Sequence, residues 1–266
     1  MKIGRIINEN QQIVLVSAAA DGQLFRANGN PLTGIVTPTN EPVKPKKWLC
    51  PIEPKVIICI GLNYSEHVKE STFSSNLPEY PVVFMKNLSA ATGHNETIHL
   101  PAVCDDEVDY EGELAVVISR PCCNVSKEDA LDFVLGYTVG NDISARIWQK
   151  TKGGSQWCRG KGFDGFAPMG PLLTTSDEIT NPNRLKIRTE LNGKIVQQSS
   201  TDHMIFDVPT LIHFLSQDTT LLGGTVIMTG TPSGIGWARE PKLMLQKGDT
   251  VSVEIENLGR LTNKIG

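Results

Sequence analysis

The chain has 266 residues, of which 39% are hydrophobic and 20% charged, a composition typical of a globular protein with a sizeable core. Its 25 Lys and Arg against 29 Asp and Glu give a net charge of -4, and no cationic run could follow a nucleic-acid backbone. No apolar stretch reaches the ~20 residues of a membrane helix, and the N-terminus lacks the apolar segment of a signal peptide. We therefore expect a cytoplasmic protein with neither nucleic acid nor membrane as partner.

The cysteines predict no metal site, because they form no Cys-x-x-Cys pair and no Cys/His spacing that suits tetrahedral zinc. A chain of this length needs no disulfides, so we expect mostly buried thiols in a reducing compartment, the adjacent pair Cys122 and Cys123 being the possible exception.

The first 50 residues predict a small β-rich N-terminal domain. Its clearest strand is the apolar run 13–16, and residues 28–31 read as a turn. Four prolines at positions 42, 45, 51 and 54 then predict an extended linker, because each fixes its own φ and disfavours helix in its neighbour. We place a domain boundary there and assign 1–50 to the small domain and 51–266 to a catalytic domain.

The rest of the chain predicts many strands and few helices. Capping residues indicate helices over 126–134 and from Asp207 onward, and Asn192-Gly193 is typical of a hairpin turn. Residues 251–256 alternate as a half-buried strand does. Together with apolar strands at 56–60, 81–85, 114–118, 185–191 and 225–228, this predicts a β-rich α+β fold of sandwich or barrel type.

Glu111 and Glu113 are two apart in a predicted strand, so their carboxylates face the same side, and Asp109 joins them if the strand begins early enough. Carboxylates held together are stabilised by a hard divalent cation. A solvated acidic strand edge explains the same pattern equally well. Asp142, at the end of another predicted strand, is either a third oxygen ligand or a helix N-cap.

Three further segments carry candidate chemistry. His67 and Glu70 are three apart after a strand, which suits a general base oriented by a carboxylate, or an ordinary surface ion pair. Lys161 lies among glycines that let a backbone approach an anionic ligand closely, although a lone lysine is usually surface charge. Thr231 lies in a Gly/Pro-rich segment that suits a carboxylate or is a plain turn.

Taken together and in order, these segments resemble the fumarylacetoacetate hydrolase superfamily from about Val56 to the C-terminus. The motifs are Gly-x-Asn-Tyr-x-x-His-x-x-Glu at 61–70, Asp-Tyr-Glu-Gly-Glu-Leu at 109–114, Asn-Asp-Ile-Ser-Ala-Arg at 141–146 and Thr-Gly-Thr-Pro-x-Gly at 229–234. The resemblance implies a mixed β-sandwich roll with a small N-terminal domain, and a homodimer. The sequence departs from the pattern at Ile147, where many relatives carry Asp, and at 222–225, where Leu-Gly-Gly-Thr replaces the usual Pro-Gly-Asp.

The resemblance also implies a role for each site residue. The metal, Mg²⁺ or Mn²⁺ and possibly Ca²⁺ in a crystal, falls on Glu111, Glu113 and Asp142. The implied catalytic residues are His67, Glu70, Lys161 and Gln149, and the implied substrate-binding residues are Thr231, Asn63 and Tyr64.

The chemistry shared by this superfamily is an enolate beside a carboxylate, stabilised by a metal. We expect hydrolysis of a carbon–carbon bond in a small 2,4-diketo acid of acylpyruvate type. Oxaloacetate decarboxylation and 2-oxo acid tautomerisation or isomerisation are the alternatives within the family, and a non-catalytic metal-binding protein is the alternative of another class. The segment 71–80 has no diagnostic pattern, and the sequence does not name the substrate.

Overall fold

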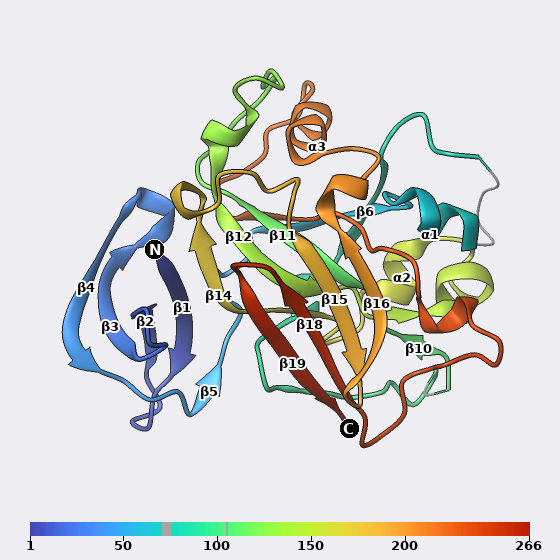
Figure 1. The fold of residues 1–266 in the computed structure, drawn as a ribbon, viewed down its shortest axis with the longest axis horizontal. Coiled ribbons are helices and arrows are strands. Elements are labelled where there is room, and N and C mark those ends of the chain that lie inside the picture. The colour runs from blue at the N-terminus through green and yellow to red at the C-terminus, as the bar shows by residue number, and fades with distance from the viewer. Residues whose placement is uncertain (71–75, 105) are drawn as a thin grey trace.

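The computed structural model of the protein describes residues 1–70, 76–104 and 106–266, and strands dominate them (Figure 1). Among these residues, twelve strands form one mixed sheet, five form a second, and β10 pairs with β13. The segment 71–80 thus lies partly outside the described residues. The strands are β1 (Lys2–Ile7), β2 (Ile13–Ala18), β3 (Leu24–Asn30), β4 (Ile35–Pro42), β5 (Lys47–Trp48), β6 (Val56–Gly61), β7 (Val82–Lys86), β8 (Ala91–Thr92), β9 (Thr97–Ile98), β10 (Val108–Asp109), β11 (Gly112–Ile118), β12 (Val134–Asn141), β13 (Ser144–Ala145), β14 (Ala167–Thr175), β15 (Lys186–Leu191), β16 (Lys194–Ser200), β17 (Thr225–Met228), β18 (Thr250–Ile255) and β19 (Gly259–Ile265).

Helices are short: α1 (Ser65–Glu70), α2 (Trp157–Lys161) and α3 (Val208–Leu215), with a π-helix, η4, at Trp148–Lys152. The β-rich α+β expectation is confirmed. Within the described residues no helix is both long and apolar enough to cross a membrane.

The N-terminal strands lie side by side at one end of the large sheet, in the order β4-β3-β2-β1 (Figure 1). They enclose a small core of their own, built on Ile6, Val14, Val16 and Leu24. β1 also pairs with β14 through two register positions, Lys2 with Thr174 and Ile3 with Leu173. The sheet therefore runs on from this unit into the rest of the chain, and a separate domain of residues 1–50 remains a proposal.

An inner strand of the large sheet, β11, lies between β12 and β17 and is buried along its whole length. Because side chains alternate across a strand, Leu114 and Val116 pack into one core while Ala115 and Val117 pack into another. The first core also contains residues of α3 and the five-stranded sheet, and the second contains residues of β6 and β17. β11 thus lies between two layers, and its first residues mark the place where the candidate carboxylates meet.

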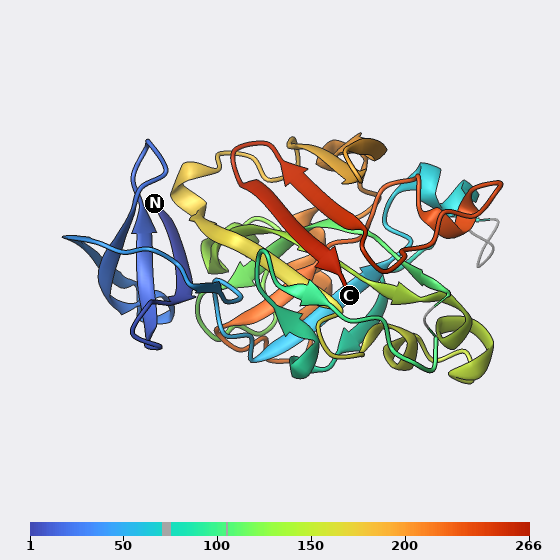
Figure 2. The same ribbon diagram turned by 90° about the horizontal axis from the view of Figure 1, so that it is seen from below.

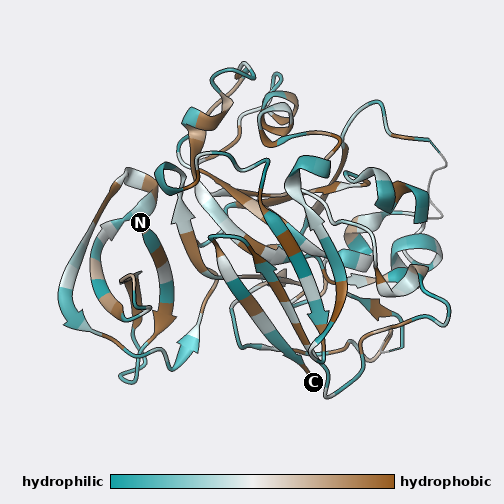
Figure 3. Cartoon of the chain, viewed as in Figure 1, coloured by the Kyte–Doolittle hydropathy of each residue, from teal (hydrophilic) through white to brown (hydrophobic). Residues whose placement is uncertain are grey.

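The five-stranded sheet, in the order β16-β15-β18-β19-β9, covers one face of the large sheet (Figure 2). Polar and apolar bands alternate along β15, β18 and β19, as expected for strands with one face on a core (Figure 3). The alternation predicted for 251–256 is nevertheless incomplete, because Ser252 is buried between Val251 and Val253. Its hydroxyl forms a hydrogen bond with the Thr262 hydroxyl across the strand pair, which satisfies it there.

Most predicted strands are confirmed, and so are the helix capped by Asp207, which is α3, and the hairpin turn. Asn192 and Gly193 both have positive φ, of 52° and 77°. The helix predicted over 126–134 is wrong. Ser126 does cap Asp129, but the chain then makes only a 3-10 turn, Ala130–Phe133, before β12 begins and pairs with β11. The turn predicted at 28–31 comes later, because β3 continues to Asn30 in its pairing with β4.

Candidate active site

Three carboxylates meet where β11 begins and β12 ends. The two strands are antiparallel, with Gly112 opposite Asn141, so Glu111 just before β11 and Asp142 just after β12 are neighbours. The Asp142 backbone N–H donates to the Glu111 carbonyl, and the Glu111 N–H to the Asn141 side chain, at 2.8 and 2.9 Å. One carboxylate oxygen from each of Glu111, Glu113 and Asp142 lies within 4.8 Å of the others, and all three residues are buried. The predicted convergence of these three residues is present.

Buried cations surround this cluster. The Lys161 ammonium donates to Glu111 at 2.9 Å, to Asp142 at 2.7 Å and to the Ser144 hydroxyl at 2.7 Å. Lys86 forms an ion pair with the other oxygen of Asp142 at 2.6 Å. Arg146 forms an ion pair with Glu111.

Glu113 is in a different electrostatic position from Glu111. Burial raises the pKa of Glu113 well above its ordinary value, and the charges of Asp142 and Glu111 raise it further. Burial acts the same way on Glu111, but the Lys161 and Arg146 charges outweigh it and hold its pKa below the usual range. The cluster thus has one carboxyl group whose ionisation a further cation would favour. A hard divalent ion suits this all-oxygen donor set, so the residues present fit Mg²⁺ or Mn²⁺.

The His67–Glu70 pair forms within α1. The His67 Nδ1 lies 2.9 Å from Glu70 Oε1, and the two Glu70 oxygens accept hydrogen bonds from the Gly234 backbone N–H at 3.0 and 2.9 Å. Because a carboxylate can only accept, it selects the imidazole form with hydrogen on Nδ1 and a lone pair on Nε2. Glu70 therefore orients the base and ties α1 to the loop that follows β17.

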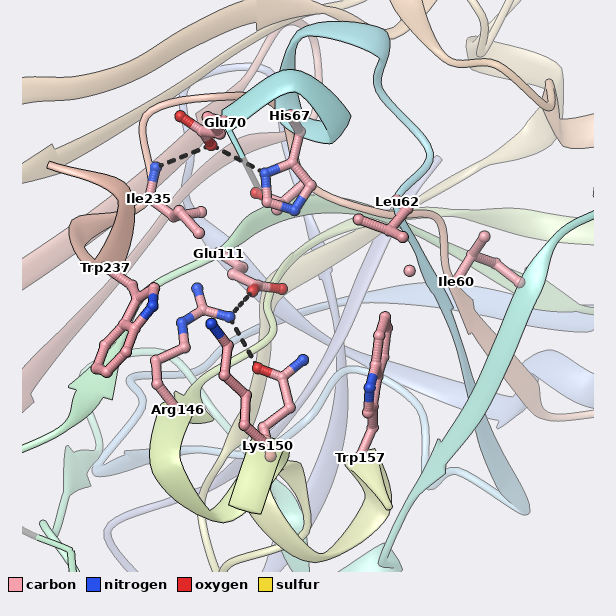
Figure 4. A pocket seen from close by; sticks show the side chains of 13 residues that line it. Ile60, Leu62, His67, Glu70, Glu111, Arg146, Lys150, Trp157, Ile235 and Trp237 are labelled. Atoms are coloured by element: carbon pink, nitrogen blue, oxygen red, sulfur yellow. Dashed lines mark hydrogen bonds and ion pairs between the residues drawn. The ribbon is translucent and has the colours of Figure 1, made fainter. Parts of the chain in front are cut away.

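A pocket opens between this pair and the carboxylate cluster (Figure 4). His67 and Glu70 lie on one side of it, and Glu111, Arg146 and Lys150 on the other. Aromatic and aliphatic side chains form the remaining walls: Ile60, Leu62, Trp157, Ile235 and Trp237. The arrangement places one potential base and one carboxylate of the candidate metal site on the same small cavity.

Close packing of Trp157 shapes one wall. Gly61 ends β6 beneath this ring, and a Cβ built at that glycine would lie 2.1 Å from the nearest ring carbon. Only glycine therefore lets the indole ring approach β6 in this way.

Three predicted residues have contacts that the sequence did not indicate. Lys161 is fully buried and its three N–H donors all have acceptors on the carboxylate cluster and Ser144, so it is neither surface charge nor open to an anion in this arrangement. Gln149 lines the pocket and accepts a hydrogen bond from Arg146 at 3.2 Å. Thr231 also lines it, while its hydroxyl donates to the Gly112 carbonyl and accepts from Gln197.

Asn63 and Tyr64, predicted to bind substrate, are not among the residues that line this pocket. The Asn63 side chain donates to the carbonyls of Thr229 and Phe206, at 2.7 and 3.0 Å, and accepts from the Phe206 N–H. Tyr64 is buried in the core, where its hydroxyl has no hydrogen-bond partner among the described residues. Asn63 thus joins the turn after β6 to two distant loops, and a substrate contact by either residue stays a prediction.

Other residues of the site were missed or misplaced by the sequence. Asp109 does not join the carboxylate cluster; it accepts two hydrogen bonds from Arg146 and two from the backbone N–H groups of Gly236 and Trp237. Arg146 is the last residue of the Asn-Asp-Ile-Ser-Ala-Arg motif, so the sequence could have identified it as a site residue. Lys150 and Trp237 reach the pocket from segments far apart in sequence that carry no such signal.

Comparisons with known proteins agree with this geometry. A sequence profile described as fumarylacetoacetate (FAA) hydrolase C-terminal matches residues 56–266. The mitochondrial oxaloacetate tautomerase fahd2 of Xenopus laevis is 45% identical over 218 residues, covering 82% of this chain and 67% of that protein.

Two solved structures are similar over the whole chain. A 2-hydroxyhepta-2,4-diene-1,7-dioate isomerase from Mycobacterium marinum is 37% identical with a TM-score of 0.80, covering 100% of this chain and 98% of the other. A fumarylacetoacetate hydrolase from Exiguobacterium antarcticum is 32% identical with a TM-score of 0.85, covering 100% and 99%. The three relatives bear names of three different activities.

Proposed function

The chain belongs to the fumarylacetoacetate hydrolase family, and from this premise we propose that it is a divalent-metal-dependent keto–enol tautomerase of a small 2-oxo acid. One observation carries the proposal. The oriented base His67 and the carboxylate Glu111 of the candidate metal site line the same pocket (Figure 4). Oxaloacetate is the first substrate to test, because the Xenopus laevis relative is named for it.

A tautomerase has to move one proton between carbon and oxygen. Glu111, Glu113 and Asp142 would hold Mg²⁺ or Mn²⁺, which when bound supplies Lewis acidity toward the 2-oxo group. The His67 Nε2 lone pair takes the proton from C3 as the C3–H bond breaks and the C2–C3 double bond forms. The same nitrogen then gives the proton to the C2 oxygen, and the reverse order converts enol to ketone.

Glu70 and the pocket walls assist this transfer. The Glu70 carboxylate stabilises the imidazolium that exists between the two proton transfers. The indole rings of Trp157 and Trp237, with Ile60 and Leu62, limit the entry of water. Gln149 and Lys161 remain proposed partners of the developing oxygen charge, which requires Lys161 to give up one of its present acceptors.

Hydrolysis of an acylpyruvate, the activity first expected from the sequence, is the second candidate. The His67–Glu70 pair favours it, because the same lone pair could deprotonate a water molecule instead of a carbon acid. The named activity of the Xenopus laevis relative supports tautomerisation more directly.

Replacement of His67 by Ala tests the proposal. Tautomerisation of oxaloacetate, followed by ultraviolet absorbance with Mg²⁺ or Mn²⁺, should fall by roughly 10²- to 10⁴-fold, the contribution of a positioned base. The dissociation constant of the metal should be unchanged, and His203→Ala, at an exposed histidine, should behave as wild type. Cleavage of acetylpyruvate to acetate and pyruvate by the wild type, without conversion of oxaloacetate, would instead establish hydrolysis. Metal binding without conversion of either compound would establish a binding protein.

The cellular setting is also a proposal. All six cysteines are free, which supports a reducing compartment such as the cytoplasm, although the Xenopus laevis relative is named as mitochondrial. A homodimer remains an expectation from the family.

A further inference from the structure

The two sides of the pocket differ in charge. Glu111, one of the three clustered carboxylates, supplies negative charge to the pocket lining (Figure 4). Arg146 and Lys150, from the segment 146–152, supply positive charge. The N–H groups of Arg146 donate to Asp109, Glu111 and Gln149, so this guanidinium serves mainly to hold the protein together. Lys150 is the other cationic side chain that lines the pocket, and it is half-buried.

The π-helix η4 brings Lys150 into the pocket. In this wider helix, consecutive residues Gln149 and Lys150 both line the cavity. Single π-turns of this kind are frequent at functional sites.

A second lysine lies near the same aromatic ring as Lys150. The Lys150 ammonium is 5.0 Å from the centre of the Trp237 ring, and the Lys242 ammonium is 3.4 Å from the same centre. Asp109 holds the Trp237 backbone in place by accepting its N–H at 2.9 Å. The backbone that carries this ring is thus held by Asp109, and two ammonium groups lie beside the ring.

We propose that Lys150, assisted by Lys242 beside Trp237, forms a subsite for the distal carboxylate of a dicarboxylic 2-oxo acid and determines specificity for it. This inference rests on the proposed function, which assigns the 2-oxo acid end of the substrate to the carboxylate cluster. The distal carboxylate then lies toward Trp237, where an anion offsets the charges of both lysines.

The local electrostatics agree with this assignment. Burial lowers the pKa of Lys150, and the neighbouring charges of Arg146 and Lys242 lower it further. A bound carboxylate counteracts all three effects, so the subsite is better satisfied with a dianionic ligand than with a monoanionic one.

The test compares oxaloacetate with its 4-methyl ester, which keeps the 2-oxo acid end and removes the distal charge. Dissociation constants are measured by calorimetry in the presence of Mg²⁺, and KM and kcat by absorbance. For Lys150→Met, the dissociation constant and KM for oxaloacetate should rise about 10- to 100-fold, the loss of one charge-assisted hydrogen bond, with less than about threefold change for the ester. Lys150→Arg should restore most of the preference, and kcat should change little in either variant.

Lys152→Met is the matched control, because Lys152 is an exposed lysine on the same π-helix and its removal changes the net charge equally. Its constants should equal those of the wild type. Equal weakening of oxaloacetate and ester in Lys150→Met overturns the subsite, and so does a wild type that binds both ligands equally. If the wild type binds oxaloacetate more tightly than the ester but converts neither, the proposed function is refuted and the subsite is not. The dissociation constants of Lys150→Met then decide whether the subsite exists.

Discussion

Glu113 shows how much a single side chain depends on its surroundings. It lies in β11 with its carboxylate close to those of Glu111 and Asp142, and its one described hydrogen bond comes from the Gly230 N–H at 2.9 Å. Three acids at such spacing repel each other unless a cation or a proton separates them. The ionised Glu113 side chain therefore destabilises the fold of the metal-free protein, and a bound metal removes this repulsion.

Replacing Glu113 by Gln should abolish metal-induced stabilisation. Wild type at a metal concentration of 100 times the dissociation constant should gain about 2.7 kcal/mol, and the variant should gain almost none. In the presence of chelator the variant should be at least as stable as wild type, because the amide stays neutral beside Glu111 and Asp142 whatever the protonation of the acid it replaces. Thermal unfolding with Mg²⁺, Mn²⁺ and chelator measures both effects. Glu128→Gln, at an exposed position, is the control, and a full metal response in Glu113→Gln would remove this residue from the site.

At this scale the sequence predicted the convergence of Glu111 and Glu113 from their spacing, and the structure places them together. It could not predict that Asp109 would pair with Arg146, because β10 ends at Asp109 and β11 begins only at Gly112, so the three acids do not share one continuous strand. Nor could it predict the acceptors of Lys161, which come from segments 17 to 50 residues away. Such contacts depend on tertiary neighbours and leave no local pattern.

Among the elements, the five-stranded sheet has a charged ladder on its open face. Arg260 of β19 donates to Glu190 of β15 and to Glu254 of β18, and Arg188 also donates to Glu254. The hydrogen bond from Arg260 lowers the pKa of Glu190, and that from Arg188 lowers the pKa of Glu254. Each carboxylate thus binds its proton less readily in the folded chain than in the unfolded one.

This ladder should contribute to stability only where its acids are ionised. A lowered folded-state pKa gives stability that is present above the unfolded pKa and is lost as pH falls through the folded value. Glu190→Gln should therefore lower stability near neutral pH by up to about 1 kcal/mol and have no effect in acid. Urea unfolding at a series of pH values measures the difference. In an Arg260→Gln background the substitution should matter less, and an equal effect at every pH would contradict the ionic origin.

Strands were more predictable than helices in this chain. Val56–Gly61 and Thr225–Met228 are continuous apolar runs because they pair in parallel inside the large sheet. The segment 126–134 has a good cap, but β12 begins at Val134 and leaves too few residues for an α-helix. A capping pattern alone does not show where the following strand begins. The pairing of β17 with β6 could not be predicted from neighbouring residues, because β6 precedes β17 by more than 160 residues.

For the whole molecule, the proposed boundary near residue 50 can be tested by truncation. A chain beginning at Lys55 keeps every proposed site residue and loses the strands β1–β5. It should retain the metal affinity of the full chain, because Glu111, Glu113 and Asp142 have no described contact with the N-terminal strands. It should unfold at a lower temperature and self-associate, because part of β14 becomes an open sheet edge. Calorimetry and light scattering measure both properties, and a folded chain without metal affinity would show that the N-terminal strands contribute to the site.

The position of β17 has a consequence for how the protein is made. Among the described strands of the large sheet, β17 lies between β6, which precedes His67, and β11, which follows Glu111, and it pairs with both. A ribosome delivers the chain from its N-terminus, so the strand pairings that connect these two parts of the sheet form only after residue 228 has emerged. A transcript that ends before this point encodes the whole His67–Glu70 pair and all three carboxylates, yet its product lacks the strand that pairs with both β6 and β11. It also lacks the pocket residues Thr231, Ile235 and Trp237.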